Sequence, residues 1–348
     1  MPLQLIKLPE AKVKFKKGRC SIPLMLKIER GDLVTRFIGR VGYTGPRTQT
    51  FHEVLLSLLT SILANHWYKQ QLAKQPEDRH IIMQWIGAWC DESQRAVPSD
   101  HQAGHRYEFQ RTGQAQELLA LAYDIYCLLE ADRLERDVRD RLKTDDQFQG
   151  ARYELAVAAI FVRSGFDIEW LDQRKGPGKR CEFIATHRVT GEVIAVEAKS
   201  RHRAGTLQQP GSPPDLASLR GDVRGLYLKA TAKEPKDKPF AIFIDANLPH
   251  QPELQHLNKT WIPEVWNMVT EHLTSLLPEP APFSAVFVTN YAWHYEGSNI
   301  PKAGEHFFIR PELTQHPWKS QSTFDAIGNG MLRYGVVPDS EDEAFSLR

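Results

Sequence analysis

The sequence predicts a mixed α/β fold with two domains, and three observations support this prediction. The chain has 348 residues, a length that favours two domains. Hydrophobic residues make up 41% of the chain and charged residues 25%, values typical of a folded globular protein. Beyond residue 150, segments with strand and helix patterns alternate, which indicates an α/β sheet with helices on both faces.

Residues 1–145 are predicted to form a mostly helical domain that begins with a few strands. The short apolar runs Ile22–Ile28 and Leu33–Ile38 are bounded by turn residues, a pattern of antiparallel strands. Leucine and isoleucine recur at helical spacing over Phe51–Ala73, and a second long helix is expected over Gln114–Leu142 with its charged second half in solvent. This part contains no functional motif, so it could recognise a target, bind a partner protein or form a homodimer.

Residues 146–348 are predicted to form the second domain, a mixed sheet flanked by helices with a C-terminal extension. Periodicity and turn residues give one helix, three strands, a helix, a strand, a helix and a strand in that order. The expected helices are Arg152–Ser164, Asp215–Ala232 and Ile262–Leu276, and the expected strands are Asp167–Leu171, Arg180–His187, Glu192–Ser200, Phe240–Asp245 and Phe283–Val288.

Composition and charge exclude several classes of protein. The net charge is +1, so attraction to a polyanion would have to come from a local cluster. The 4 cysteines form no CxxC pair, which argues against a disulfide framework and a zinc ribbon. No apolar stretch of about 18 residues and no signal-peptide pattern is present, so we expect a cytoplasmic protein without a membrane span.

The segment Lys179–Arg203 contains the residues for which we predict chemistry. Its two expected strands flank Thr190-Gly191, a dipeptide that suits a short hairpin connection. If these residues form the turn, antiparallel pairing places Glu182 opposite Lys199. Side chains alternate along a strand, so Glu197 shares a face with Lys199 and with the opposed Glu182. A longer turn would shift this register.

Two carboxylates and a lysine on one patch suit phosphodiester hydrolysis. The diagonal separation of such residues is roughly 7–8 Å between backbones, which leaves room for one divalent ion. Glu182 and Glu197 would hold Mg²⁺ or Mn²⁺, which polarises the scissile phosphate and lowers the pKa of an attacking water. Lys199 would orient that water or neutralise charge developing on the phosphorane. The alternative is a solvated ion pair between Glu197 and Lys199 on an edge strand.

The arrangement resembles the PD-(D/E)xK, or restriction-endonuclease-like, nuclease superfamily over about residues 150–290. The resemblance consists of an acid on one strand, fourteen residues, then Glu197-Ala198-Lys199 on the next strand, all preceded by a helix that contains Glu154. It implies a mixed sheet flanked by helices and a metal-dependent nuclease. The substrate that we expect is DNA, with RNA as the alternative. Glu154 would be the helix acid that joins the metal shell, and Glu182 would take the place of the family's Asp.

The chain departs from the family at its Pro-Asp pair, which is Cys181-Glu182 here. A glutamate can ligate the same metal through a longer side chain, so the departure is compatible with activity. Glu154 has an alternative explanation, because acids are favoured in the first turn of a helix by the helix dipole.

Local charge also favours a polyanion. Between Arg174 and Arg203 the sequence has eight Lys or Arg residues and only three acids, a cluster that provides phosphate contacts independent of base sequence. A solvated loop is the simpler alternative. The residues predicted to contact nucleic acid are Arg174, Lys175, Lys179, Arg180, Arg201 and Arg203.

Two functions follow from these patterns. The first is a nuclease that uses one or two divalent ions. The second is a catalytically inactive subunit with a nuclease fold, which binds nucleic acid or acts as a scaffold. A small-molecule α/β enzyme is less favoured, because the sequence contains no GxGxxG, Walker A or GxSxG motif.

Overall fold

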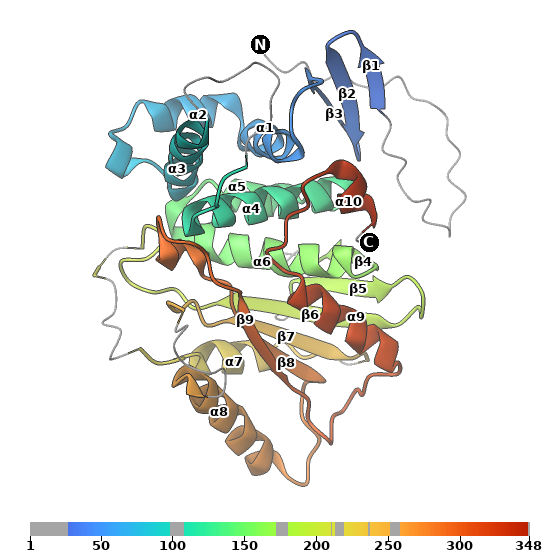
Figure 1. The fold of residues 1–348 in the computed structure, drawn as a ribbon. Coiled ribbons are helices and arrows are strands. Elements are labelled where there is room, and N and C mark those ends of the chain that lie inside the picture. Colours follow the sequence, from blue (N-terminus) through green and yellow to red (C-terminus); the bar gives the residue numbers. More distant parts are fainter. Residues whose placement is uncertain are drawn as a thin grey trace.

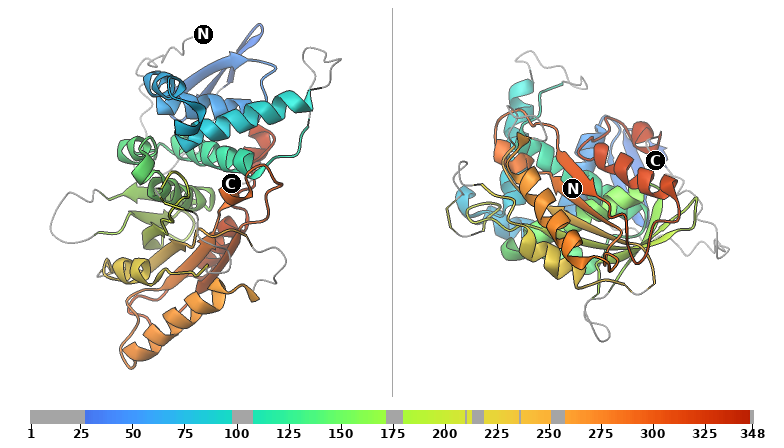
Figure 2. Two further views of the ribbon diagram at one scale, coloured as in Figure 1. Left: turned by 90° about the vertical axis from the view of Figure 1, so that its left-hand side faces the viewer. Right: turned by 90° about the horizontal axis from the view of Figure 1, so that it is seen from below.

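The protein is described by a computed structural model that covers residues 27–97, 108–171, 180–209, 211–212, 219–235, 237–250 and 258–346. It has a mixed α and β architecture with a six-stranded mixed sheet flanked by helices and a separate small sheet. In Figure 1 the large sheet crosses the middle of the molecule, with N-terminal helices on one side and α7 (Arg224–Thr231) and α8 (Trp261–Leu276) on the other. The left view of Figure 2 shows the same layers from the side.

The small sheet is an antiparallel meander of β1 (Lys27–Arg30), β2 (Leu33–Ile38) and β3 (Val41–Pro46). The strand predicted at Leu33–Ile38 is confirmed, whereas most of the one predicted at Ile22–Ile28 lies outside the described residues. Gly39 turns the chain between β2 and β3 with φ at +56°, and a Cβ atom there would collide with the carbonyl oxygen of Leu129. This glycine therefore lets the small sheet approach the helices closely.

The single helix predicted over Phe51–Ala73 is divided in the structure. Helix α1 (Phe51–Leu63) begins with a capping box between Thr50 and Glu53, and α2 (Asn65–Leu72) follows after Ala64. Ala64 has φ at +73°, which a helix cannot accommodate. A short 3₁₀ turn, η1 (Pro76–Asp78), then leads into α3 (Ile81–Ala96), a helix that the sequence analysis did not predict.

His80 is the N-cap of α3. Its ring is fully buried, and Nδ1 accepts a hydrogen bond from the backbone N–H of Ile82 at 3.3 Å, which requires an unprotonated nitrogen. Burial lowers the pKa of His80 to about 4, and the charge of Lys74 acts in the same direction. Asp145 lies 3.5 Å from Nε2 but is half exposed, so solvent screens its charge. Protonation of His80 would therefore break the cap.

Because of the His80 cap, we expect the free energy of unfolding to depend on pH. Because the pKa of His80 falls from 6.5 to about 4 on folding, its contribution is complete above pH 6.5 and is lost as the pH falls toward 4. We expect this residue to account for about 3 kcal/mol of the free energy of unfolding across that window. The free energy of unfolding can be measured by urea unfolding at several pH values between 4 and 7, for the wild type and for His80→Asn, which keeps a capping group. We expect it to change less with pH in the variant. An equal change of the free energy of unfolding with pH in both proteins would contradict the prediction.

The long helix predicted over Gln114–Leu142 is also two helices, α4 (Gly113–Glu130) and α5 (Arg136–Arg141). The break follows from Asp132, whose φ of +56° turns the chain away from the axis of α4. Nearly every residue of α4 is buried, so this helix lies inside the protein and not along its surface. Helix α5 contacts α6 (Asp145–Arg163), which begins several residues before the predicted Arg152.

The large sheet has the strand order β4-β5-β6-β7-β8-β9. The first three strands pair antiparallel, β6, β7 and β8 are parallel, and β9 returns antiparallel at the edge. The strand predicted at Phe240–Asp245 is confirmed without change, while β9 was not predicted. The bounds are β4 (Phe166–Trp170), β5 (Phe183–His187), β6 (Val193–Ser200), β7 (Phe240–Asp245), β8 (Ala285–Asn290) and β9 (Glu305–Ile309).

Two apolar cores lie on the two faces of this sheet. One joins α1, α4, α6 and α9 (Gln321–Leu332) to the upper face in Figure 1, and continues to Ala344 in α10 (Glu341–Ser346). The other packs α7 and α8 against the opposite face. The boundary predicted after residue 145 coincides with the start of α6, and the first core extends across it. The N-terminal helices and the sheet thus share one packed interior.

None of the helices within the described residues combines the length and the apolar character needed to cross a bilayer.

Candidate active site

The β5–β6 hairpin brings the predicted acids together, although its register differs from the prediction. The connection is four residues long, Arg188–Gly191, and the N–H of His187 donates to the carbonyl oxygen of Glu192 at 2.9 Å. Phe183 therefore pairs with Val196, and the N–H of Glu182 also donates to the carbonyl oxygen of Val196 at 2.9 Å.

The predicted pairing of Glu182 with Lys199 is wrong, because the longer turn shifts the partner strand by two residues. Glu182 lies beside Val196 and Glu197 instead. Side chains alternate with a period of two, so a shift of two residues keeps them on the same face. The predicted convergence of Glu182, Glu197 and Lys199 is therefore preserved.

Two lysines bind the two carboxylates. The Nζ atom of Lys199 lies 2.9 Å from Oε1 of Glu182 and also forms an ion pair with Glu197. Lys233, in the turn after α7, places its Nζ 2.8 Å from Oε1 of Glu197 and 3.3 Å from Oε1 of Glu182. The cluster thus contains two negative and two positive side chains, contributed by β6 and by the segments before β5 and after α7.

The environment separates the pKa values of the two carboxyl groups. Burial raises the pKa of Glu197 to about 7, and the negative charge of Glu182 adds to this against the opposing effect of Lys199 and Lys233. Burial also acts to raise the pKa of Glu182, but Lys199 and Lys233 hold it below its usual value. The two carboxylates raise the pKa of Lys199, so this lysine stays charged at neutral pH. Two acids with divergent pKa values are typical of catalytic sites.

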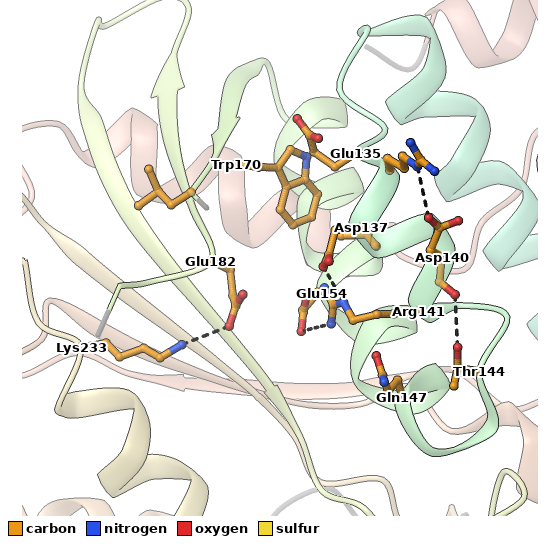
Figure 3. A pocket seen from close by; sticks show the side chains of 13 residues that line it. Glu135, Asp137, Asp140, Arg141, Thr144, Gln147, Glu154, Trp170, Glu182 and Lys233 are labelled. Atoms are coloured by element: carbon orange, nitrogen blue, oxygen red, sulfur yellow. Dashed lines mark hydrogen bonds and ion pairs between the residues drawn. The ribbon is translucent and has the colours of Figure 1, made fainter. Parts of the chain in front are cut away.

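A cleft with a volume of about 1050 Å³ opens beside this cluster. Figure 3 shows Glu182 and Lys233 on one side of it, and Glu154 with Arg141 on the other. Nη1 of Arg141 donates to Oε1 of Glu154 at 3.0 Å. Burial raises the pKa of Glu154 against the effect of Arg141, and the negative charge of Glu182 raises it further. The predicted helix acid therefore lies close enough to Glu182 for the two charges to interact.

The residues present fit a divalent cation held by two carboxylates. Oε2 of Glu197 is buried and accepts no hydrogen bond from the residues that the structure describes, so a further ligand could satisfy it. Mg²⁺ in phosphoryl-transfer sites is bound by one or two carboxylates together with waters and substrate phosphates. Within the described residues, no group of three or more His, Cys, Asp or Glu side chains is gathered closely enough to form an all-protein cation cage. Glu182 and Glu197 are thus the pair that would hold a cation.

The residues predicted to contact phosphate fall into three groups: those outside the described residues, those at the surface, and the buried Arg203. Arg174, Lys175 and Lys179 lie outside the described residues. Arg180 is half-buried, and Arg201 forms an ion pair with the exposed Asp222.

Arg203 has a different role from the one predicted. Its guanidinium is buried and donates to the carbonyl oxygens of Ala246, Asn247 and Gly221, so it holds loops together in this structure. Arg188 lies at the turn, at the opposite end of the hairpin from Glu182, and pairs with Asp167 at 3.0 Å. Of the described residues that were predicted to contact nucleic acid, Arg180 and Arg201 are therefore the two whose side chains reach the surface. They lie within two residues of Glu182 and Lys199 in the sequence.

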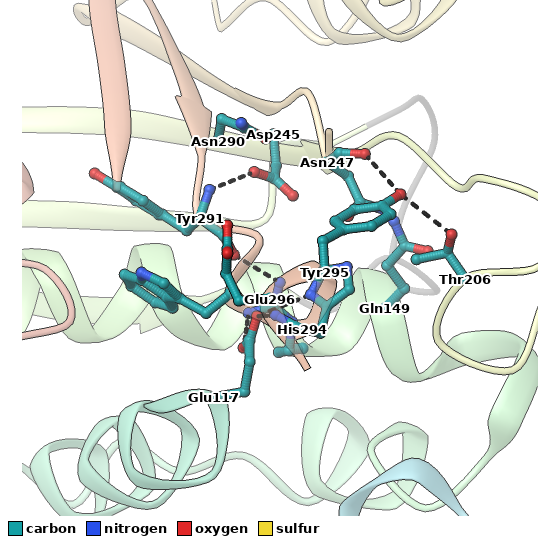
Figure 4. A network of polar contacts seen from close by, with 12 residues as sticks. Glu117, Gln149, Thr206, Asp245, Asn247, Asn290, Tyr291, His294, Tyr295 and Glu296 are labelled. Carbon is teal, nitrogen blue, oxygen red and sulfur yellow. Dashed lines mark hydrogen bonds and ion pairs between the residues drawn. The ribbon is translucent and has the colours of Figure 1, made fainter. Parts of the chain in front are cut away.

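A buried polar network supports the end of β6 from the α6 side of the sheet, and Figure 4 shows two of its members, Asp245 and Gln149. Asp245, the last residue of β7, accepts hydrogen bonds from Ser200 and Thr289, each at 3.2 Å. Gln149 of α6 donates to the hydroxyl of Ser200 at 3.2 Å. Ser200 directly follows Lys199, so the network holds the backbone that carries the lysine.

Two residues of the site, Lys233 and Arg141, were not predicted from the sequence. Lys233 follows α7 in a lysine-rich stretch that resembles no catalytic motif. It reaches Glu197 only because α7 packs against β6 and β7. Arg141 belongs to a segment whose alternating charges were interpreted as a solvated helix face. Its proximity to Glu154 depends on the break at Asp132. A search for lysines near the end of the helix after the E-x-K strand could have identified Lys233.

Comparisons of the chain with models of protein families, with curated proteins and with solved structures found no match. The interpretation of the site therefore depends on its own geometry and chemistry.

Proposed function

We propose that this protein is a metal-dependent nuclease of the PD-(D/E)xK kind that hydrolyses phosphodiester bonds in DNA. The observation that carries the proposal is the convergence of Glu182, Glu197 and Lys199, with Nζ of Lys199 2.9 Å from Oε1 of Glu182, beside a cleft that also contains Glu154. These are the residue types that this chemistry requires: Glu197 and Lys199 lie on β6, and Glu182 lies directly before β5.

The order of elements supports the same proposal. Helix α6 is followed by the antiparallel strands β4, β5 and β6, then by α7 and by β7, which pairs parallel with β6. The acids lie where β5 begins and β6 ends, at the carboxyl end of the parallel strand. Functional groups of open α/β sheets gather at this edge.

Each residue has a defined task in the proposed reaction. Glu182 and Glu197 would hold Mg²⁺ or Mn²⁺, which supplies Lewis-acid polarisation of the phosphate and a more acidic water. Lys199 places its ammonium at the centre of the cluster, where it orients the attacking water and neutralises charge that develops on the phosphate oxygens. Glu154 accepts hydrogen bonds from Arg141 and adds negative charge on the facing wall.

The test is cleavage of plasmid and single-stranded DNA with Mg²⁺ or Mn²⁺, and with a chelator, for the wild type and for Glu182→Gln. This substitution keeps the shape of the side chain and removes the charge that a cation needs. We expect cleavage by the wild type that requires the cation, and a loss of at least about tenfold in the variant. Glu169→Gln, at an exposed position on β4, is the matched control and should leave the rate unchanged.

Binding of DNA without cleavage by the wild type would contradict the proposed activity and favour the alternative of an inactive nuclease-fold subunit. Cleavage that persists in Glu182→Gln at the wild-type rate would also contradict it, because the activity would then come from another site or a contaminant.

A further inference from the structure

Lys233 separates the cleft from the buried carboxylate of Glu197. Its side chain is 14% exposed, and its Nζ contacts Oε1 of Glu197 at 2.8 Å and Oε1 of Glu182 at 3.3 Å. Lys233 and Glu182 line the cleft, whereas Glu197 is fully buried and is not part of that lining. A cation that enters from the cleft therefore meets Lys233 before it reaches Glu197.

The two lysines of the cluster are held differently. Lys199 lies on the same strand as Glu197, and its Nζ also donates to the carbonyl oxygen of Ala198 at 3.3 Å. Lys233 reaches the acids from the turn after α7, and its Nζ contacts only the two carboxylates among the interactions described. Of the two, Lys233 is the one that can turn into the cleft without leaving another hydrogen bond unmade.

Charge balance requires one ammonium group to leave when a cation binds. The pair of carboxylates is already neutralised by Lys199 and Lys233. A divalent ion would add two positive charges at close range in a poorly solvated site, where repulsion between like charges is strong. The buried Oε2 of Glu197, to which no described residue donates a hydrogen bond, would then gain a ligand.

We propose that Lys233 is an exchangeable counter-ion of the Glu182–Glu197 pair. It neutralises the pair before a divalent cation binds, gives way to that cation, and then presents its ammonium in the cleft as a contact for a substrate phosphate. This inference rests on the proposed function, because it concerns the same cation and the same substrate.

The lining of the cleft gives the displaced ammonium a role. Three acids on and beside α5 face the cleft, and they repel a polyanion: Glu135, Asp137 and Asp140. The two basic side chains of α5 that line the cleft are paired, Arg136 with Asp140 at 3.4 Å and Arg141 with Asp137 at 2.9 Å. Among the residues described as lining the cleft, Lys233 is the one cation whose partners a metal ion would take over, so cation binding would create the positive charge that a phosphate needs.

The first arm of the test measures Mn²⁺ affinity by isothermal titration calorimetry with the full chain. We expect Lys233→Met to bind Mn²⁺ about tenfold more tightly than the wild type, because the competing ammonium is gone. Lys229→Met, at an exposed position one helical turn earlier, is the matched control and should bind like the wild type. Lys233→Gln, which keeps a hydrogen-bond donor, provides a second variant if the methionine variant folds poorly.

The second arm measures binding of a fluorescent DNA oligonucleotide with Mn²⁺ present, using phosphorothioate linkages that resist cleavage so that Lys199 stays in place. We expect Lys233→Met to bind more weakly than the wild type, and its plot of log K against log salt concentration to have a smaller slope, by the amount of about one phosphate contact. Without Mn²⁺ this difference should disappear, because Lys233 is then occupied by the carboxylates.

The outcomes distinguish this inference from the function on which it rests. Unchanged or weaker Mn²⁺ binding in Lys233→Met, together with cation-dependent cleavage by the wild type, would overturn the counter-ion role and leave the nuclease intact. Tighter Mn²⁺ binding with an unchanged salt dependence would overturn the phosphate contact. If neither wild type nor variant binds Mn²⁺, the proposed function and the inference both fail.

Discussion

Lys199→Met is expected to lower the rate of DNA cleavage by about 100- to 1000-fold while leaving the fold intact. The magnitude is that of removing one preorganised group that stabilises charge in a transition state. The ammonium of Lys199 contacts Glu182 and Glu197 together and retains its charge at neutral pH because both carboxylates raise its pKa. Methionine keeps the length of the side chain and removes the charge, so packing on β6 changes little.

The measurement is single-turnover cleavage of a labelled duplex with Mg²⁺, combined with Mn²⁺ titration of the same preparation. We expect Mn²⁺ binding to persist in Lys199→Met, which separates loss of chemistry from loss of the cation. Lys319→Met, at an exposed position before α9, is a control for the loss of a lysine and should cleave at the wild-type rate. A Lys199→Met protein that cleaves within about threefold of the wild type would contradict the catalytic assignment.

The buried ion pair between Glu117 and Arg152 is expected to dominate the effect of single substitutions on stability. Nη1 of Arg152 lies 2.9 Å from Oε2 of Glu117, and the two side chains are 4% and 0% exposed. Nδ1 of His294 lies 2.8 Å from Oε1 of Glu117 (Figure 4). Burial acts to raise the pKa of Glu117, but Arg152 and His294 hold it below its usual value. Glu117 therefore depends on Arg152 to remain ionised inside the protein.

Arg152→Met should lower the free energy of unfolding by about 3–5 kcal/mol, because it leaves a buried carboxylate without its main partner. Urea unfolding followed by circular dichroism measures this change. The double variant Arg152→Met/Glu117→Gln should recover part of the loss, since the isolated charge is then absent as well. Arg40→Ala, which removes an 83% exposed partner of Asp132, is the surface control and should cost less than about 1 kcal/mol. A loss below about 1 kcal/mol in Arg152→Met would contradict the argument.

The local patterns of the sequence predicted much of the second half of the fold. The strand Phe240–Asp245 was predicted at its observed bounds, because a short apolar run between turn residues has few alternatives. The α8 helix begins one residue before the predicted Ile262 and ends at the predicted Leu276. Strand β8 and helix α7 were predicted with shifted bounds, and part of the expected helix from Asp215 lies outside the described residues.

Breaks within helical patterns were not predictable in the same way. The periodicity of apolar residues continues through Ala64 and reaches the charged stretch after Asp132, so each pattern indicated one long helix. The chain turns at these two positions because the residues adopt positive φ values, which no local pattern in the sequence requires. Tertiary packing therefore decided where α1 and α4 end.

The sequence by itself determined that Glu197 and Lys199 share one face, because side chains alternate with a period of two along a strand. Glu182 lies on the same face because the observed register differs from the predicted one by two residues, whereas a shift of one residue would have placed it on the opposite face. The sequence could not determine the register, since a four-residue turn and a two-residue turn place the same face against different partners. Lys233 and Arg141 entered the site only through the packing of α7 and α5, since contacts between distant segments depend on the path of the whole chain. The shared face of Glu197 and Lys199 was therefore a local property of the sequence, whereas the register of Glu182 and the positions of Lys233 and Arg141 were decided by the tertiary structure.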